Sequence, residues 1–189
     1  ATLTDMVRTL KAAGVSGALV LQPANHGYDH RYVHEALLAE PQFLRGMCLA
    51  NPTLPVQEAV ADLEQLRERG FGAVRFNAAS FPGGLDSPVG HSLFLKAEEL
   101  AMPVGIMCFT GLTAHADAIE ALLKSSPSTR VVIDHWGFPR QPATGGLLGD
   151  AATSNEAAWA ALLALSKYPQ VFVKLSSMFR VSALPWPHQ

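Results

Sequence analysis

Six short apolar segments recur along this chain, mostly at intervals of about 30 residues, the length of a strand, a helix and their two connections. The segments are residues 17–22, 45–50, 72–76, 103–109, 130–134 and 171–175. They are almost continuously apolar rather than alternating, which is typical of parallel strands covered on both faces. The repeat therefore predicts one α/β domain with six parallel strands.

Amphipathic stretches between these strands predict helices, and a glycine or a proline closes several of them. The predicted helices are residues 4–13, 30–39, 55–69, 89–101, 114–125 and 155–168. In the third of them, Val56, Val60, Leu63 and Leu66 fall near helical spacing. We expect these four side chains to form its buried stripe.

Parallel strand–helix units fold either as an open doubly wound sheet or as a closed (β/α)8 TIM barrel. No G-x-G-x-x-G turn follows the first strand, which argues against a dinucleotide-binding open sheet. A complete barrel has eight strands, whereas only six are found in this chain, which opens on a helix and ends soon after a strand. The pattern alone leaves both folds open and favours the barrel.

Composition excludes several classes of function. The net charge is −2 with no basic run, so a nucleic-acid partner is not expected. No apolar run reaches the roughly 18 residues of a membrane span. Cys48 and Cys108 each lie in an apolar strand-like run, which predicts two buried, reduced thiols. The oligomeric state stays open, as does the compartment, for which the cytoplasm or a plastid is expected.

Polar side chains stand at the ends of the predicted strands, and in a barrel they would meet at the carboxyl-terminal mouth, where barrel enzymes keep their chemistry. They are Gln22 and Asn25, Arg75 and Asn77, Asp134 and His135, and Lys174, Ser176, Ser177 and Arg180. Lys174 is the clearest signal, because it interrupts an apolar strand and must reach the mouth or be buried at high cost. We therefore favour a contact with a substrate carboxylate or phosphate over a structural ion pair. An extended loop predicted over residues 137–154 would join the same mouth.

Other candidate sites are weaker. His26, His30 and His34 lie close together in the sequence, yet no carboxylate or cysteine completes a metal-ligand set. A structural or surface role is expected for them. A serine nucleophile is not indicated, because the usual G-x-S-x-G turn does not occur.

Five motifs, in order, carry a family resemblance: LVLQPANHGYDH, RGMCLANP, GAVRFN, VVIDHWGFP and VFVKLSSMFRVS. With these motifs the chain resembles the amidohydrolase-related family (amidohydrolase 2), which includes pyrone-dicarboxylate lactonase and fuconolactonase-like hydrolases. The greatest similarity is to uncharacterised plant and algal members. The resemblance implies a (β/α)8 barrel and hydrolysis of a lactone, an ester or a C–N bond in a small substrate that bears a carboxylate.

The resemblance also implies roles for individual residues. His135 would be the catalytic residue that polarises the scissile carbonyl, or a metal ligand as in metal-dependent relatives. The substrate would be bound by Arg75, Asn77, Lys174, Ser176 and Arg180, with the cations on its anionic groups. Many relatives carry a histidine on the fifth strand of the complete barrel. Met107 stands at about that position, in the fourth of the six segments of this chain. The cofactor therefore stays open between a divalent metal such as Zn²⁺ and none.

Two family features do not occur in residues 1–189: the H-x-H pair of the first strand and the aspartate of the last strand, which would activate water. The expected fold is thus a TIM barrel truncated to strands 2–7, a single domain incomplete at both ends. A non-catalytic carboxylate-binding barrel (a pseudoenzyme) or an inactive fragment is the alternative function.

Overall fold

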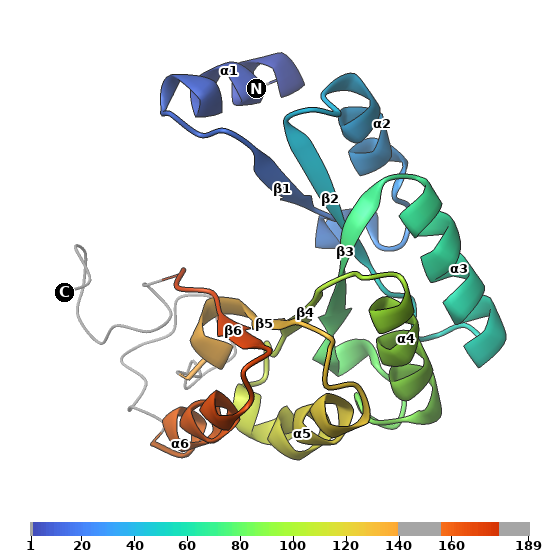
Figure 1. The fold of residues 1–189 in the computed structure, drawn as a ribbon, viewed down its shortest axis with the longest axis vertical. Coiled ribbons are helices and arrows are strands. Elements are labelled where there is room, and N and C mark those ends of the chain that lie inside the picture. The colour runs from blue at the N-terminus through green and yellow to red at the C-terminus, as the bar shows by residue number, and fades with distance from the viewer. Residues whose placement is uncertain (1, 140–155, 178–189) are drawn as a thin grey trace.

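The computed structural model describes residues 2–139 and 156–177, which form one parallel sheet with helices packed against it (Figure 1). The strands are β1 (Ala18–Leu21), β2 (Leu44–Leu49), β3 (Phe71–Asn77), β4 (Val104–Met107), β5 (Val131–Ile133) and β6 (Val171–Val173). The helices are α1 (Leu3–Ala12), α2 (Arg31–Ala39), α3 (Val56–Glu68), α4 (Pro88–Glu99), α5 (Ala116–Ser125) and α6 (Glu156–Ala164). Each predicted strand and helix is confirmed, with differences only at the ends. The predicted loop over residues 137–154 lies mostly outside the described residues.

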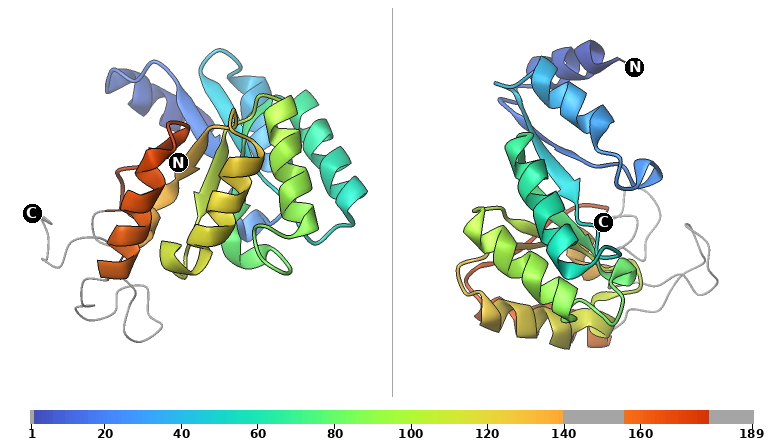
Figure 2. Two further views of the ribbon diagram at one scale, coloured as in Figure 1. Left: turned by 60° about the horizontal axis from the view of Figure 1, so that its bottom comes forward. Right: turned by 90° about the vertical axis from the view of Figure 1, so that its right-hand side faces the viewer.

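The order of the strands distinguishes the two folds that the sequence leaves open. All six strands are parallel, and each pairs with its neighbour in the sequence, from β1 to β6. A doubly wound sheet reverses its strand order and carries helices on both faces. Here the sheet curls, and α2 to α6 follow its convex side (Figure 2). The chain is therefore a truncated (β/α)8 barrel, as predicted, in which β1 and β6 are the open edges.

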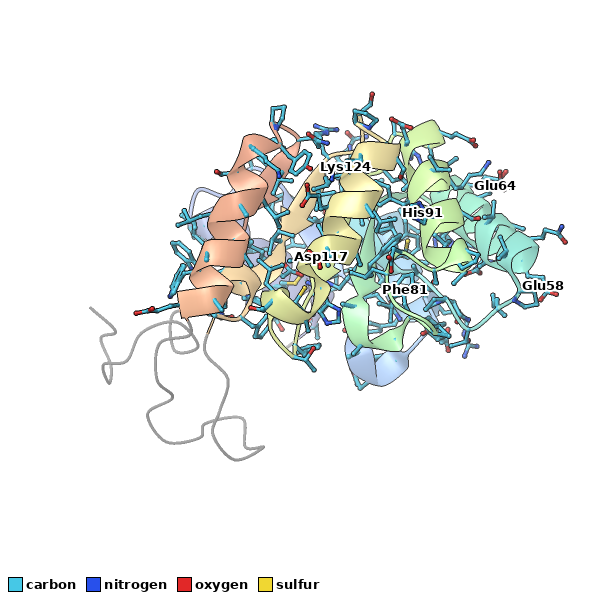
Figure 3. All side chains as sticks on the ribbon, turned by 90° about the horizontal axis from the view of Figure 1, so that it is seen from below. Glu58, Glu64, Phe81, His91, Asp117 and Lys124 are labelled. Atoms are coloured by element: carbon cyan, nitrogen blue, oxygen red, sulfur yellow. The ribbon has the colours of Figure 1, made fainter. Side chains whose placement is uncertain are left out.

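Alternate strand residues divide between the two faces of the sheet, because side chains point to opposite sides along a strand. One set packs against the helices and forms the core, for example Val74, Phe76, Val104, Ile106, Val131 and Ile133, all fully buried. The other set lines the concave side. Figure 3 shows the outer surface of the helices, where Glu58, Glu64, Asp117 and Lys124 are found, whereas the labelled Phe81 is buried against the core.

The buried stripe of α3 differs from the predicted one. Leu63 and Leu66 are buried as expected, but Val56 is exposed and Val60 is only partly buried, while Ala59 is buried in their place. Val56 is the first residue of the helix and is 36% exposed. Helical spacing alone gives the angular position of a side chain but does not say how far the partner surface reaches.

The two cysteines are free and buried, as predicted. Burial raises the pKa of the Cys108 thiol to about 12, and burial likewise raises the pKa of Cys48. Because the thiolate is the nucleophilic form, neither side chain is suited to nucleophilic catalysis at neutral pH. Within the described residues, no helix is long and apolar enough to cross a membrane.

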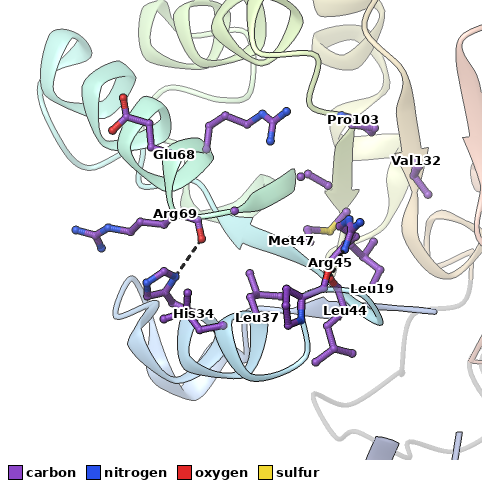
Figure 4. A pocket seen from close by; sticks show the side chains of 16 residues that line it. Leu19, His34, Leu37, Leu44, Arg45, Met47, Glu68, Arg69, Pro103 and Val132 are labelled. Carbon is purple, nitrogen blue, oxygen red and sulfur yellow. Dashed lines mark hydrogen bonds between the residues drawn. The ribbon is translucent and has the colours of Figure 1, made fainter. Parts of the chain in front are cut away.

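A hollow of about 960 Å³ opens at the amino ends of the strands (Figure 4). Its walls include Leu19, Leu37, Met47, Pro103 and Val132, with Arg45 and Arg69 near the rim. The hollow lies between α2, the end of α3 and the amino ends of the strands. It does not include the polar residues at the carboxyl ends of the strands, so its size alone does not locate the chemistry.

The two sheet edges predict self-association of the 189-residue polypeptide. Leu19 on β1 and Phe172 on β6 are 47% and 51% exposed, and unpaired parallel edges with apolar side chains template pairing between chains. We expect the substitution Leu19→Lys with Phe172→Lys to reduce the associated fraction, measured by light scattering at micromolar concentration. Leu95→Lys, on the exposed surface of α4, is the matched control. An unsubstituted polypeptide that is a monomer with one cooperative thermal transition, or association that the two substitutions leave unchanged, would contradict this expectation.

Candidate active site

A buried carboxylate joins three strands at their carboxyl ends. Asp134 follows β5 directly, and its side chain is only 4% exposed. Its Oδ2 atom lies 2.8 Å from Nη2 of Arg75 on β3, and its Oδ1 atom lies 3.3 Å from Nζ of Lys174 just after β6. A carboxylate so deeply buried requires such partners, because an unpaired ion in the interior costs several kcal/mol. The three side chains therefore form one charged cluster at the mouth.

The two cations differ in exposure. The side chain of Arg75 is 16% exposed, whereas that of Lys174 is 40% exposed. Arg75 is therefore held in the interior by Asp134, while the ammonium group of Lys174 remains within reach of a ligand. Lys174 does reach the mouth as the sequence predicts, and it also makes an ion pair with Asp134, the alternative to a substrate contact.

The chain after Asp134 makes a left-handed turn. His135, Trp136, Gly137 and Phe138 all have positive φ values, of 52°, 58°, 72° and 54°. This conformation costs about 1–2 kcal/mol for each residue that is not glycine. A Cβ atom on Gly137 would lie 2.9 Å from Cβ of Leu112, so the position admits only glycine. Strained backbone of this kind persists only where the surroundings hold it, and it clusters at functional sites.

His135 is held against the end of β6. Its Nδ1 atom lies 2.8 Å from the hydroxyl of Ser176 and 2.9 Å from the hydroxyl of Ser177. The edge of its ring faces Phe138, with ring centroids 5.3 Å apart at an interplanar angle of 86°. The Trp136 amide donates to the Lys174 carbonyl oxygen at 3.4 Å, which ties the turn to the same segment.

Several buried polar atoms lack a hydrogen-bond partner. Within the described residues they include Gln22 Oε1, Arg75 Nε, Asn77 Oδ1, Asp134 Oδ2 and Trp136 Nε1. Asp134 Oδ2 is close to Arg75, yet the two are not aligned as a hydrogen bond. Buried polar groups are normally paired, so each exception needs an explanation. All five atoms belong to residues at or just beyond the carboxyl ends of strands, where a barrel enzyme binds its ligand.

Most of the predicted site residues are brought together. Arg75, Lys174, His135 and Ser176 meet at the ends of β3, β5 and β6. Arg180 lies outside the described residues. Asp134 has a role that was not predicted from the sequence, although the signal was present: an acidic residue directly after a buried strand requires a cationic partner.

The histidines at positions 26, 30 and 34, which lie close together in the sequence, make structural contacts. His30 Nε2 accepts a hydrogen bond from the Leu49 amide at 3.0 Å, and His34 Nδ1 lies 3.0 Å from the Arg69 carbonyl oxygen. His26 stacks on Tyr32 with ring centroids 5.2 Å apart. Burial lowers the pKa of His30, which favours the neutral ring that accepts the Leu49 hydrogen bond.

A comparison with protein families decides the identity of this barrel. The family model described as amidohydrolase matches residues 1–189. The chain belongs to the amidohydrolase family. No curated protein matches this amidohydrolase chain.

Solved structures agree with the fold. A Pseudomonas putida protein assigned as a 2-pyrone-4,6-dicarboxylic acid hydrolase shares 27% identity at a TM-score of 0.74, over 98% of this chain and 62% of that one. A probable 2-pyrone-4,6-dicarboxylic acid hydrolase of Acinetobacter baumannii, with citric acid bound, shares 21% identity at a TM-score of 0.73, over 98% and 63%. A 5-carboxyvanillate decarboxylase of Novosphingobium aromaticivorans with bound manganese has a TM-score of 0.58 at 15% identity, over 70% and 49%. The chain thus spans less than two thirds of the length of these structures.

The described part of this amidohydrolase does not fit a divalent metal by itself. It contains no group of three His, Cys, Asp or Glu side chains placed to hold an ion. Asp134 is engaged by Arg75 and Lys174. At the end of β4, where the resemblance leads one to expect a histidine, the chain carries the buried thioether of Met107. A thioether is a poor ligand for a hard, water-activating metal.

The charged cluster predicts a large loss of stability when one partner is removed. In the full-length protein, Arg75→Met should lower the free energy of unfolding by about 3–5 kcal/mol, because Asp134 stays buried with only one cation. Arg75→Met combined with Asp134→Leu should restore most of the loss. Arg8→Met, which removes the exposed partner of Asp5, should cost at most about 1 kcal/mol. Urea denaturation measures the free energy of unfolding of all three variants. Equal losses for Arg75→Met and Arg8→Met would show that the buried ion pair is no more costly to break than an exposed one.

Proposed function

We propose that this amidohydrolase chain is the larger part of the catalytic barrel of a hydrolase that cleaves a lactone, an ester or a C–N bond in a small carboxylate-bearing substrate. The observation that carries the proposal is the charged cluster beside His135. Among the described residues, two cations, Arg75 and Lys174, face one carboxylate, Asp134, so this part of the cluster holds one positive charge in excess. An anionic substrate group completes its charge balance.

Lys174 is the residue best placed to bind that group. Its side chain is 40% exposed, and its distance of 3.3 Å to Asp134 is longer than the 2.8 Å between Arg75 and Asp134. A carboxylate at the mouth can therefore approach Lys174 while Arg75 continues to neutralise Asp134. Ammonium–carboxylate hydrogen bonds are about twice as strong as neutral ones. The structural neighbour from Acinetobacter baumannii was solved with citric acid bound, which supports a carboxylate-bearing ligand.

In this proposal His135 polarises the scissile carbonyl by donating a ring N–H to its oxygen, which gains negative charge as water attacks. Asp134 does not activate the water, because both of its oxygens face cations. It positions Arg75 and Lys174. The resemblance assigns the activation of water to an aspartate of the last barrel strand, which residues 1–189 do not contain.

One observation favours a second candidate, a carboxylate-binding barrel without turnover. Met107 is 5% exposed on β4 and brings no chemistry to a position where many relatives carry a histidine. Binding without hydrolysis would leave Lys174 and Arg75 in the same roles. Both candidates predict the same carboxylate binding. They differ because only the hydrolase turns its substrate over, in a reaction that depends on His135.

Carboxylate binding is tested with citrate as the probe. In the full-length protein, Lys174→Met should weaken the affinity for citrate about 10- to 100-fold, because it removes a charge-assisted hydrogen bond of about 1.5–3 kcal/mol. Lys167→Met is the matched control, since Lys167 pairs with Glu120 on the outer surface. Isothermal titration calorimetry measures both variants. Unchanged citrate affinity in Lys174→Met would refute the role of this residue.

Turnover is tested with His135→Asn in the full-length protein and a panel of lactones of dicarboxylic acids. We expect kcat to fall at least about 100-fold, the usual effect of removing one preorganised donor to a developing oxyanion. The unfolding temperature should stay close to that of the wild type, and citrate should still bind. Wild-type turnover by His135→Asn would exclude His135 from catalysis, whereas citrate binding without turnover by any variant would establish the binding barrel.

A further inference from the structure

Two serine hydroxyls converge on one nitrogen of His135. Ser176 Oγ lies 2.8 Å and Ser177 Oγ lies 2.9 Å from Nδ1. Consecutive residues in an extended chain send their side chains to opposite sides. Ser177 instead has a positive φ of 57°, and this turn in the backbone lets the second hydroxyl reach the same atom. This left-handed conformation costs about 1–2 kcal/mol for a residue that is not glycine. At Ser177 the strain accompanies the contact between its hydroxyl and Nδ1 of His135.

The chemistry of these partners differs from that of the partners of the other histidines. A backbone amide can only donate, so the Leu49 amide requires a bare Nε2 on His30. A backbone carbonyl can only accept, so the Arg69 oxygen requires a proton on Nδ1 of His34. A serine hydroxyl can donate or accept. The serine contacts at Nδ1 of His135 are therefore compatible with a proton on Nε2, whereas the contacts of His30 and His34 call for a proton on Nδ1.

We propose that Ser176 and Ser177 are positioning residues that donate a hydroxyl hydrogen to Nδ1 of His135 and keep the ring proton on Nε2. The inference rests on the proposed function, in which His135 donates an N–H to the scissile carbonyl. In that role Nε2 is the nitrogen that donates to the scissile carbonyl oxygen. The partner of one ring nitrogen sets the role of the other in this way at many histidine sites.

The pair is redundant. One lone pair on Nδ1 accepts one strong O–H hydrogen bond, so either serine can supply it when the other is replaced. The ring is also restrained by Phe138 and by the left-handed backbone of His135 itself. Single replacements are therefore expected to change little, whereas loss of both hydroxyls removes the preference for the Nε2–H tautomer and leaves the orientation of the ring intact.

The deciding experiment is a nitrogen NMR measurement on the full-length protein labelled with 15N-histidine, at a pH well above the ordinary imidazole pKa of about 6.5. The His135 resonances are assigned by their loss in His135→Asn. We expect a protonated Nε2 and a bare Nδ1 for His135, and the opposite tautomer for His30 and His34 as internal controls. A proton on Nδ1 of His135 in the wild type would overturn the proposal without any need for a variant.

Kinetics give a second, independent test. Ser176→Ala and Ser177→Ala should each lower kcat by less than about threefold. The double variant should lower kcat about 10- to 100-fold with little change in KM, the range found when a partner that orients a functional histidine is removed. Ser176→Thr in the Ser177→Ala background should restore kcat, because threonine keeps the hydroxyl. Full activity in the double alanine variant, or a full loss in each single variant, would contradict the redundant pair.

The outcomes separate this inference from the proposed function. An Nε2–H tautomer that is lost in the double alanine variant supports the serine pair even when no substrate is turned over. A proton on Nδ1 together with hydrolysis that depends on His135 would retain the hydrolase and reject the serine pair.

Discussion

The arrangement of the mouth depends on one buried carboxylate. Asp134 is placed in the interior by β5, and it is stable there because Arg75 and Lys174 reach it from β3 and β6. Buried ion pairs of this kind contribute little net stability compared with apolar packing, but breaking one is costly. The cluster therefore acts mainly as a geometric constraint: it fixes the relative positions of three strand ends and of His135, the next residue in the chain.

The fold was largely predictable because its signals are local and repeated. Each apolar strand and each amphipathic helix is specified by its own residues, and six repeats together leave only two folds to choose between. That choice rests on whether the helices cover one face or two and on the order of the strands, both of which arise from the twist and curl of the assembled sheet. The burial of Ala59 in place of Val56 shows the same limit within a single helix.

The site was only partly predictable, because its decisive contacts join residues far apart in the sequence. The sequence indicated that Arg75, His135 and Lys174 would reach one mouth, since carboxyl ends of parallel strands lie together. It did not indicate that Asp134 would take both cations, nor that Ser177 would turn back toward the ring of His135. Such pairings depend on side-chain reach and on backbone angles in short segments, which composition and periodicity do not encode.

The regular barrel and its irregular mouth are linked through backbone strain. A left-handed run from His135 to Phe138 and a left-handed Ser177 are unfavourable local conformations, and they face each other across the ends of β5 and β6. Neighbouring strands held in register by the sheet can support this strain, because the hydrogen bonding between them continues beyond β6, from the Lys174 amide to the Ile133 carbonyl oxygen at 2.9 Å. The rigid repeat of the barrel thus supplies the support, and the irregular strand ends supply the chemistry, which is why local sequence rules succeed for the barrel and fail at its mouth.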